Sequence, residues 1–272
     1  MTKLALIGLL LVLALAAAQI IAARGFARTT ATLEDRLRAT PPPAARSDLP
    51  EIVRAFALRG GAEPGALAPL ITLRQETEMR LQRGGNWQPM AARQTIATGA
   101  PGFVWAAVQR KGPLPMVRVV DAFVDGRGKL AARLLGSVPV ASSTGIDTDI
   151  GEAMRYLAEL VWAPDAILGN PELIWEQVAD DAVVVSLAPP LEAARVRMRF
   201  DAAGDVVEIT ARNRPATAPD GSLIYLDWRA TLGGYATIGN RRVPRNGEVG
   251  YLYPEGYEPY WRGTITAYRA GD

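Results

Sequence analysis

The chain has 272 residues, and its 30 basic side chains against 28 acidic ones leave a net charge of +2. Such an even balance is not typical of proteins that bind nucleic acid, so we expect no nucleic-acid partner. The sequence contains no cysteine and no histidine, which excludes disulfides, Cys/His zinc sites, thiolate nucleophiles and Ser-His-Asp triads. We predict no cofactor and no metal site.

An apolar run near the N-terminus, LALIGLLLVLALAAAQIIAA at 4–23, contains one polar residue, Gln19. Twenty residues of helix span roughly 30 Å, about the hydrocarbon thickness of a bilayer. We therefore predict a transmembrane signal-anchor over residues 1–24, with the membrane as its partner. A signal peptide cleaved after the alanines at 16–18 is the alternative, and the continuation of the run through Ile21 favours the anchor.

The orientation of this segment rests on two opposing signals. The short tail before the run favours an exported domain, whereas the arginines at 24, 28, 36 and 38 favour the opposite orientation under the positive-inside rule. We predict a single-pass protein of the bacterial inner membrane whose domain is extracytoplasmic, in the periplasm.

Residues 25–47 end in PPPAARS and predict an extended, proline-rich linker. The remaining chain, 48–272, is then a single β-rich domain. A short helix opens it, with Ser47 or Asp48 as its cap and the glycine pair at 60–61 as its end.

From about residue 70, apolar residues recur at every second position, which is typical of half-buried strands. In RVRMRF at 195–200, for example, three apolar side chains face one way and three arginines face the other. The pairs Asp125-Gly126, Gly233-Gly234 and Asn246-Gly247 predict tight turns, so the sheet should be antiparallel. Further strands are expected at 74–82, 88–97, 102–110, 116–124, 128–136, 182–187, 205–212, 223–231, 247–253 and 261–268.

A helical pattern interrupts the strands at 148–164, TDIGEAMRYLAELVWAP. Asp149 and Glu152 fit a capping box, Pro164 ends the helix, and a second short turn is expected over 165–168. An apolar stripe runs along one side of this helix, at Ile150, Met154, Leu157 and Val161. We predict a mainly β (α+β) fold: a curved antiparallel sheet, or half-open barrel, with this helical element as a lid on its concave side.

Charged side chains on this helix form the first candidate site. Glu152, Arg155 and Glu159 share one helical face, where they either point at a ligand or form an ion network. If these side chains face the sheet, the arginine between the two carboxylates would keep both ionised, which opposes a general-acid role. Asp121 lies on the same strand face as Val119, so it is either paired with an arginine or lines a cavity.

Two other patterns have a functional and a purely structural interpretation. Glu76 and Glu78 share a strand face with Arg80. They either form half of a carboxylate pair for glycoside hydrolysis or metal binding, or belong to a strand face exposed to solvent. Late aromatic residues either line a groove for an amphiphile or pack in the core; they are Tyr251, Tyr253, Tyr257, Tyr260 and Trp261, together with Trp87, Trp105 and Trp162. We predict no catalytic residue and the following ligand-binding residues: Trp105, Asp121, Glu152, Arg155, Glu159, Trp162, Tyr260 and Trp261.

Several strings together resemble the DUF6544 family of uncharacterised bacterial proteins. They include LPEIVRAF (49–56), VRVVDAFVDGRGKLAARLLGSVPVA (117–141), GEAMRYLAELVWAP (151–164) and PEGYEPYWRGTITAYR (254–269), and the resemblance covers roughly 48–269. It implies N-terminal hydrophobic helices but no established activity. The order of elements is also similar, at the level of fold, to the lipoprotein carriers LolA and LolB.

The expected function is non-enzymatic. A concave apolar sheet with a helical lid beside a membrane tether suits a hydrophobic or amphipathic ligand, such as a lipid or acyl chain, at the cell envelope. A carboxylate-dependent hydrolase and a structural module that docks an unspecified protein partner on its β edge are the alternatives.

Overall fold

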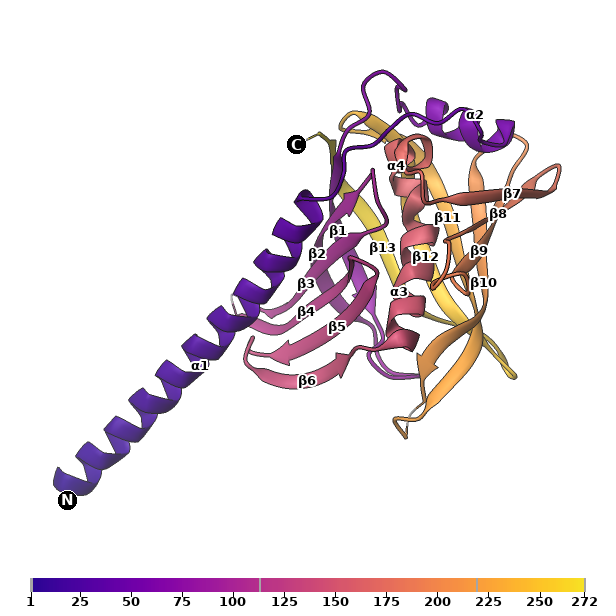
Figure 1. Ribbon diagram of the computed structural model, residues 1–272. Helices are drawn as coiled ribbons and strands as arrows, with labels where there is room; N and C mark the ends of the chain where they lie inside the picture. Colours follow the sequence, from indigo (N-terminus) through magenta and orange to yellow (C-terminus); the bar gives the residue numbers. More distant parts are fainter. Residues whose placement is uncertain (1, 113, 219, 272) are drawn as a thin grey trace.

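The computed structural model describes residues 2–112, 114–218 and 220–271. Across these residues, 13 antiparallel strands form one sheet that curls into a half-barrel (Figure 1), so the predicted fold class is confirmed. The strands are β1 (Leu70–Met79), β2 (Gln88–Ala97), β3 (Phe103–Lys111), β4 (Leu114–Val124), β5 (Arg127–Leu134), β6 (Val138–Ser143), β7 (Ile174–Ala179), β8 (Ala182–Ser186), β9 (Arg195–Phe200), β10 (Val206–Thr217), β11 (Leu223–Ile238), β12 (Arg241–Tyr253) and β13 (Gly256–Ala270).

The sheet consists of two meanders joined by one long-range pairing. Strands β1 to β6 and strands β7 to β13 each pair in sequence, and β1 pairs with β13 between them. The edges of the sheet are therefore β6 and β7. The helical elements are α1 (Thr2–Arg38), α2 (Glu51–Arg59), α3 (Ile146–Ala158), the 3₁₀ turn η1 (Glu159–Trp162) and α4 (Pro164–Gly169).

Helix α3 crosses the concave side of the half-barrel, as predicted for the lid (Figure 1). It contacts β4 and β5 in the first meander and β9 and β10 in the second, so it bridges the two halves of the curled sheet. Its apolar stripe explains this position, because Met154 and Leu157 are buried in the main core.

The predicted caps of both domain helices are wrong. Helix α3 starts at Ile146 without a side-chain cap, and Asp149 lies inside it. Asp149 instead accepts hydrogen bonds from the Gly128 N–H at 2.7 Å and from Arg127 Nη1 at 2.9 Å, so its carboxylate joins the helix to β5. Helix α2 likewise starts after Pro50 with no side-chain cap, and the Asp48 carboxylate pairs with an arginine.

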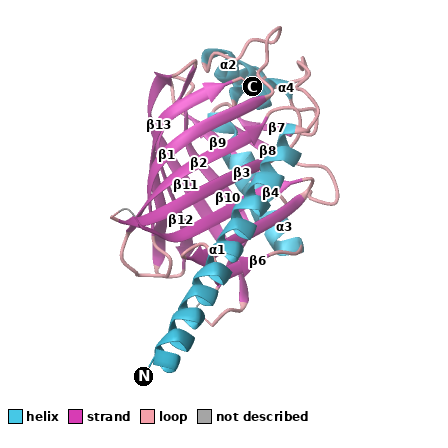
Figure 2. Ribbon diagram, turned by 90° about the vertical axis from the view of Figure 1, so that its left-hand side faces the viewer, coloured by secondary structure: helices cyan, strands magenta, loops and turns pink. Residues whose placement is uncertain are grey.

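Helix α1 is longer than the apolar run, so the predicted linker at 25–47 is wrong up to Arg38. No proline follows until Pro41, and the helix continues across the outer face of the sheet (Figure 2). Phe26 and Leu37 are buried there against β2 to β5, and the Arg133 guanidinium lies 5.1 Å from the centroid of the Phe26 ring. Packing of these apolar side chains therefore extends the helix beyond the membrane segment.

The segment after α1 is extended, as the prolines predict, but it is bound to the domain. The Ala44 N–H donates to the Gly169 carbonyl and the Arg46 N–H to the Leu168 carbonyl, each at 2.9 Å. A Cβ added at Gly99 would lie 2.1 Å from the Pro41 carbonyl oxygen, which shows how closely the segment follows the sheet.

Two of the predicted turns are absent from their expected positions. Gly233-Gly234 lies within β11 and Asn246-Gly247 lies within β12, and the two strands pair in one register on both sides of Gly234. The chain reverses instead at Gly239, whose φ is 62° and where a Cβ would lie 2.0 Å from the Tyr268 carbonyl oxygen. The turn at Asp125-Gly126 is confirmed.

We expect Leu37→Ala to destabilise the protein by about 2–3 kcal/mol, because Leu37 is fully buried between α1 and the sheet. Urea unfolding of the detergent-solubilised chain, followed by tryptophan fluorescence, measures the change. Leu58→Ala on α2 is the control, since Leu58 is 37% exposed and should matter much less. Equal effects of the two substitutions would contradict the docking of α1.

Candidate functional site

Arg155 of α3 lies at the centre of a buried group of charged side chains. Its Nε donates to Glu159 Oε1 at 2.9 Å, and its Nη1 pairs with Asp121 Oδ2 on β4. The guanidinium lies over the rings of Phe103 and Trp105 on β3, 4.7 and 5.1 Å from their centroids. Burial opposes the charge, but the carboxylates of Glu159 and Asp121 outweigh burial and raise the pKa of Arg155. Arg155 is therefore a fixed cation.

A chain of hydrogen bonds connects this group with the first three strands. Trp105 Nε1 donates to Gln75 Oε1 at 2.7 Å, and Gln75 Nε2 donates to Gln94 Oε1 at 3.3 Å. Gln94 Nε2 in turn donates to Glu159 Oε2. Burial raises the pKa of Glu159, while its ion pair with Arg155 opposes that rise. Both carboxylate oxygens of Glu159 thus have fixed partners.

Glu152 is the third carboxylate of the group and is 7% exposed. Burial raises its pKa well above the usual range for a glutamic acid, and repulsion from Asp121 raises it further. Glu152 Oε2 and Asp121 Oδ1 are both buried without a hydrogen-bond partner among the residues that the structure describes. A proton held by Glu152 and directed at Asp121 satisfies both oxygens, so we infer that Glu152 is a neutral acid.

Arg214 of β10 joins the group from the other half of the sheet. Its Nη2 donates to the Gly151 carbonyl at 3.1 Å and its Nη1 to the Tyr251 hydroxyl at 2.6 Å. Tyr251 stacks on Tyr260 with the ring centroids 5.1 Å apart, and Trp228 Nε1 donates to the Tyr260 hydroxyl at 3.0 Å. Arg214 thereby links α3 to the aromatic side chains of β11 to β13.

We define the buried charge cluster as Asp121, Glu152, Arg155, Glu159 and Arg214. With Glu152 neutral, two carboxylates face two guanidiniums, and the cluster carries no net charge. This balance matters because an uncompensated charge in an apolar interior costs several kcal/mol. Within the described part of the chain, Arg214 Nε is one of eight buried side-chain atoms without a hydrogen-bond partner, and a bound polar group is one way to satisfy such an atom.

Trp162 and Trp261 form a separate apolar pair, with ring centroids 6.4 Å apart. Trp162 Nε1 donates to the Pro244 carbonyl at 2.9 Å, and the Tyr268 hydroxyl donates to the Trp162 carbonyl at 2.7 Å. Both indoles belong to the main core between the helices and the concave face of the sheet. These bonds fix η1 against β12 and β13.

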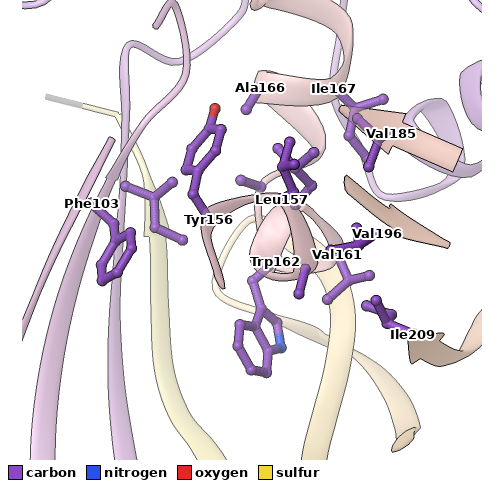
Figure 3. Close-up of a cluster of buried hydrophobic side chains, with 14 of the residues drawn as sticks. Phe103, Tyr156, Leu157, Val161, Trp162, Ala166, Ile167, Val185, Val196 and Ile209 are labelled. Atoms are coloured by element: carbon purple, nitrogen blue, oxygen red, sulfur yellow. The ribbon is translucent and has the colours of Figure 1, made fainter. Parts of the chain in front are cut away.

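Side chains from α3, η1 and α4 fill the concave space. In Figure 3, Leu157 and Val161 lie between Phe103 on one side and Val185 and Val196 on the other. Two hollows lie outside this space: one of about 700 Å³ beside the outward-facing Glu76, Glu78 and Arg262, and one of about 200 Å³ between α1 and strands β2 to β4. The core side chains of α3, η1 and α4 therefore occupy this space while the helix is packed on the sheet.

The structure brings most of the predicted ligand-binding residues together. Trp105, Asp121, Arg155 and Glu159 form one bonded network, and Glu152 couples to Asp121. Tyr260 reaches the cluster through Tyr251 and Arg214, whereas Trp162 and Trp261 lie in their own pair. Asp121 is paired with an arginine, one of its two predicted environments. A role of these residues in ligand binding stays a prediction.

Sequence reasoning missed Gln75, Gln94 and Arg214. Gln75 shares the inward face of β1 with Leu73 and Thr77, so the period of two could have marked it as a buried polar residue. Arg214 follows a bulge in β10 that shifts the pairing between Ala211 and Arg214. The bulge breaks the alternation that would have placed Arg214 inside.

The Glu76 and Glu78 pair lies on the outer face of β1. Glu78 pairs with Arg262 at 2.6 Å, and Arg80 lies over the Trp87 ring, 4.5 Å from its centroid. Glu76 is exposed. This arrangement matches the solvated-surface interpretation of these carboxylates.

Three solved structures have similar folds at low sequence identity. The first is a domain from Vibrio parahaemolyticus described as an outer membrane lipoprotein-sorting protein, with 9% identity and a TM-score of 0.46 over 80% of this chain and 90% of that chain. The second is a LolA superfamily protein from Nitrosomonas europaea, with 7% identity and a TM-score of 0.41 over 81% of this chain and 94% of that chain. The third is a DUF1329 family protein from Desulfovibrio piger, with 9% identity and a TM-score of 0.44 over 82% of this chain and 94% of that chain. No curated protein matches the chain in sequence. A family model described as a family of unknown function, DUF6544, matches residues 40–263.

Proposed function

The chain belongs to the DUF6544 family, whose function is unknown, and we propose that it binds one amphipathic ligand, such as a lipid, between α3 and the concave face of its sheet. The apolar walls of this site are Trp105, Trp162, Tyr260 and Trp261. Its polar end is the buried charge cluster, at which an acceptor oxygen of the ligand accepts a hydrogen bond from Arg214 Nε.

One observation carries this proposal: a helix with a charged inner face lies in the opening of a curled sheet that could otherwise hold a ligand. Helix α3 meets both halves of the sheet, and beneath it Arg214 Nε is a buried donor without a partner. A ligand with an acyl chain and an oxygen-bearing headgroup matches both the apolar walls and this donor.

The connection before α3 suits a lid that opens. Gly145 has a φ of 105°, and a Cβ at this position would meet no atom within 4 Å. Its neighbours Thr144 and Ile146 are exposed. Gly145 itself is therefore free of close contacts, and small exposed residues next to an element often serve as hinges. An opening movement must also break the bonds from Asp149 to Gly128 and Arg127.

The N-terminal helix is the basis for the proposed location of the protein in the cell. Among the described residues, one helix, Ala5–Arg38, is long and apolar enough to cross a membrane. An apolar helix at the start of a chain serves either as a signal or as an anchor. We favour an uncleaved anchor over residues 1–24 in the bacterial inner membrane, with the domain over 48–272 on the extracytoplasmic side.

Photocrosslinking tests the binding proposal. The full chain is reconstituted with a phospholipid that carries a photoreactive group on its acyl chain, and the adducts are mapped by peptide mass spectrometry. We expect adducts on β3, α3 and β13 in addition to those on the membrane segment of α1. Adducts confined to α1 and the outer surface would contradict the proposal.

A pair of arginine variants tests the polar end of the site. Arg214→Gln removes the bonds to Gly151 and Tyr251 together with the free Nε donor, so interior adducts should fall several-fold. Arg212→Gln changes an exposed arginine on the same strand and should leave the adducts unchanged. Equal adduct yields from both variants would remove Arg214 from the site.

A further inference from the structure

Gln19, the polar residue within the apolar run of α1, is bound to the domain. Its Nε2 donates to the Leu135 carbonyl at 2.9 Å, and its Oε1 accepts a hydrogen bond from the Ser137 hydroxyl. A Cβ added at Gly136 would lie 3.4 Å from the Cβ of Ala23. The turn between β5 and β6 therefore lies beside the last helical turns of the apolar run, as Figures 1 and 2 show for β6 and α1.

This contact determines how close the domain comes to a bilayer. Gln19 precedes the end of the apolar run at Ala23 by four residues, which is about 6 Å along a helix axis. If the apolar run spans the hydrocarbon layer, the β5–β6 turn must lie in contact with the membrane. It lies at the depth of the interfacial layer, which interfacial protein segments enter by about 5–10 Å.

From this geometry we infer that the domain rests on the bilayer through a membrane-proximal surface that inserts into the headgroup layer of anionic phospholipids. We define this surface by Lys111, Leu114, Leu135, Val138 and Val140, together with α1 from Gln19 to Arg28. The inference rests on the proposed membrane anchor.

Exposed aliphatic side chains gather on this surface. Leu114, Leu135, Val138 and Val140 are 59%, 45%, 51% and 58% exposed. They are neighbours in the sheet, because the Leu135 N–H donates to the Met116 carbonyl at 2.7 Å and Val138 pairs with Leu134. Aliphatic side chains held at strand ends beside a membrane helix match the apolar part of the interfacial layer.

The charges on this surface have one sign. The segments at 19–33, 109–118 and 133–141 contain no aspartate and no glutamate, and their basic residues are Arg24, Arg28, Arg110, Lys111, Arg118 and Arg133. Arg24, Arg28 and Lys111 are exposed. Acidic residues return on α1 only at Glu34, farther from the apolar run. Basic side chains beside exposed aliphatic ones match a layer of anionic headgroups, which attracts cations near the membrane surface.

Single-cysteine labelling tests this inference directly, since the chain has no cysteine of its own. Leu135→Cys, Val178→Cys and Leu10→Cys are each labelled with an environment-sensitive fluorophore. The full chain is reconstituted in vesicles of equimolar phosphatidylcholine and phosphatidylglycerol with nitroxide-bearing lipids. Val178 is the matched control, because it is also 45% exposed but lies on β7, the opposite edge of the sheet.

We expect a nitroxide near the headgroup to quench the Leu135 label, a nitroxide deep in the acyl chain to quench the Leu10 label, and neither to quench the Val178 label. Quenching of the Leu135 label should weaken in pure phosphatidylcholine; equal quenching would overturn the role of anionic headgroups. A quenched Leu10 label with an unquenched Leu135 label would overturn the inference, leaving this surface to a protein partner while the anchor stands. An unquenched Leu10 label would overturn the anchor as well.

Discussion

Replacing Arg155 with methionine should destabilise the fold by about 3–5 kcal/mol, because it leaves Asp121 and Glu159 buried without their cation. Both carboxylates are bonded directly to Arg155, and their side chains are 10% and 11% exposed. Methionine keeps much of the apolar volume over Phe103 and Trp105, so lost packing contributes little. Urea unfolding at neutral pH measures the change.

Two further variants separate the loss of the ion network from the loss of an arginine. Arg195→Met breaks a surface pair with Glu176 in which both side chains are more than half exposed, and its effect should stay within about 0.5 kcal/mol. The triple variant Asp121→Leu, Arg155→Met and Glu159→Met removes Arg155 together with both of its carboxylates and should recover most of the loss. Glu152 then loses the repulsion from Asp121 and is left to balance Arg214. A triple variant as unstable as Arg155→Met would show that the cluster itself stabilises the fold.

Glu152→Gln should make the protein less sensitive to alkaline pH. The folded state raises the pKa of Glu152 through burial and the nearby Asp121, so the folded chain holds a proton that the unfolded chain releases above about pH 4.5. The stability from this group is complete below the unfolded pKa and is lost as the pH rises towards the folded pKa. The loss is roughly 1 kcal/mol per pH unit in that window.

Glutamine mimics the protonated acid, since its amide can donate to Asp121 Oδ1. The variant should therefore match the wild-type stability near pH 5 and exceed it near pH 8, as read from urea midpoints at the two pH values. Glu159 retains its own raised pKa, so some dependence of the same sign persists. Glu208→Gln, on the outer part of β10, is the control. Parallel pH profiles for wild type and Glu152→Gln would show that Glu152 is ionised in the folded protein.

The sequence predicts the strands of this fold wherever one face is buried and the other is wet. Segments such as RVRMRF follow the burial pattern of β9 residue by residue. The strands that the period of two did not reveal, β6 and β7, are the two edges of the sheet. All six residues of β6 are exposed, so its sequence has no alternation to detect.

Other errors arise where a tertiary contact overrides a local signal. Asp149 looks like a helix cap but binds the backbone of Gly128, and the glycine pair at 233–234 looks like a turn but lies inside the long strand β11. The candidate site was predicted best on α3 and the start of η1, where helical spacing places Glu152, Arg155 and Glu159 on one face. Arg214 could not be placed, because its bulge hides the direction of its side chain.

The continuity of α1 has a mechanical consequence for any anchored form of the protein. One unbroken helix runs from the apolar run to Arg38, and the segment after it is bound to the domain by Ala44 and Arg46. Such a connection has no flexible linker, so the domain stays at a constant distance from the bilayer while it diffuses and rotates in the membrane plane. The anchored domain therefore cannot carry a ligand across a compartment by diffusion, as a soluble carrier does. Delivery would need a donor and an acceptor that come to it, one from the lipid layer beneath and one from the space around it.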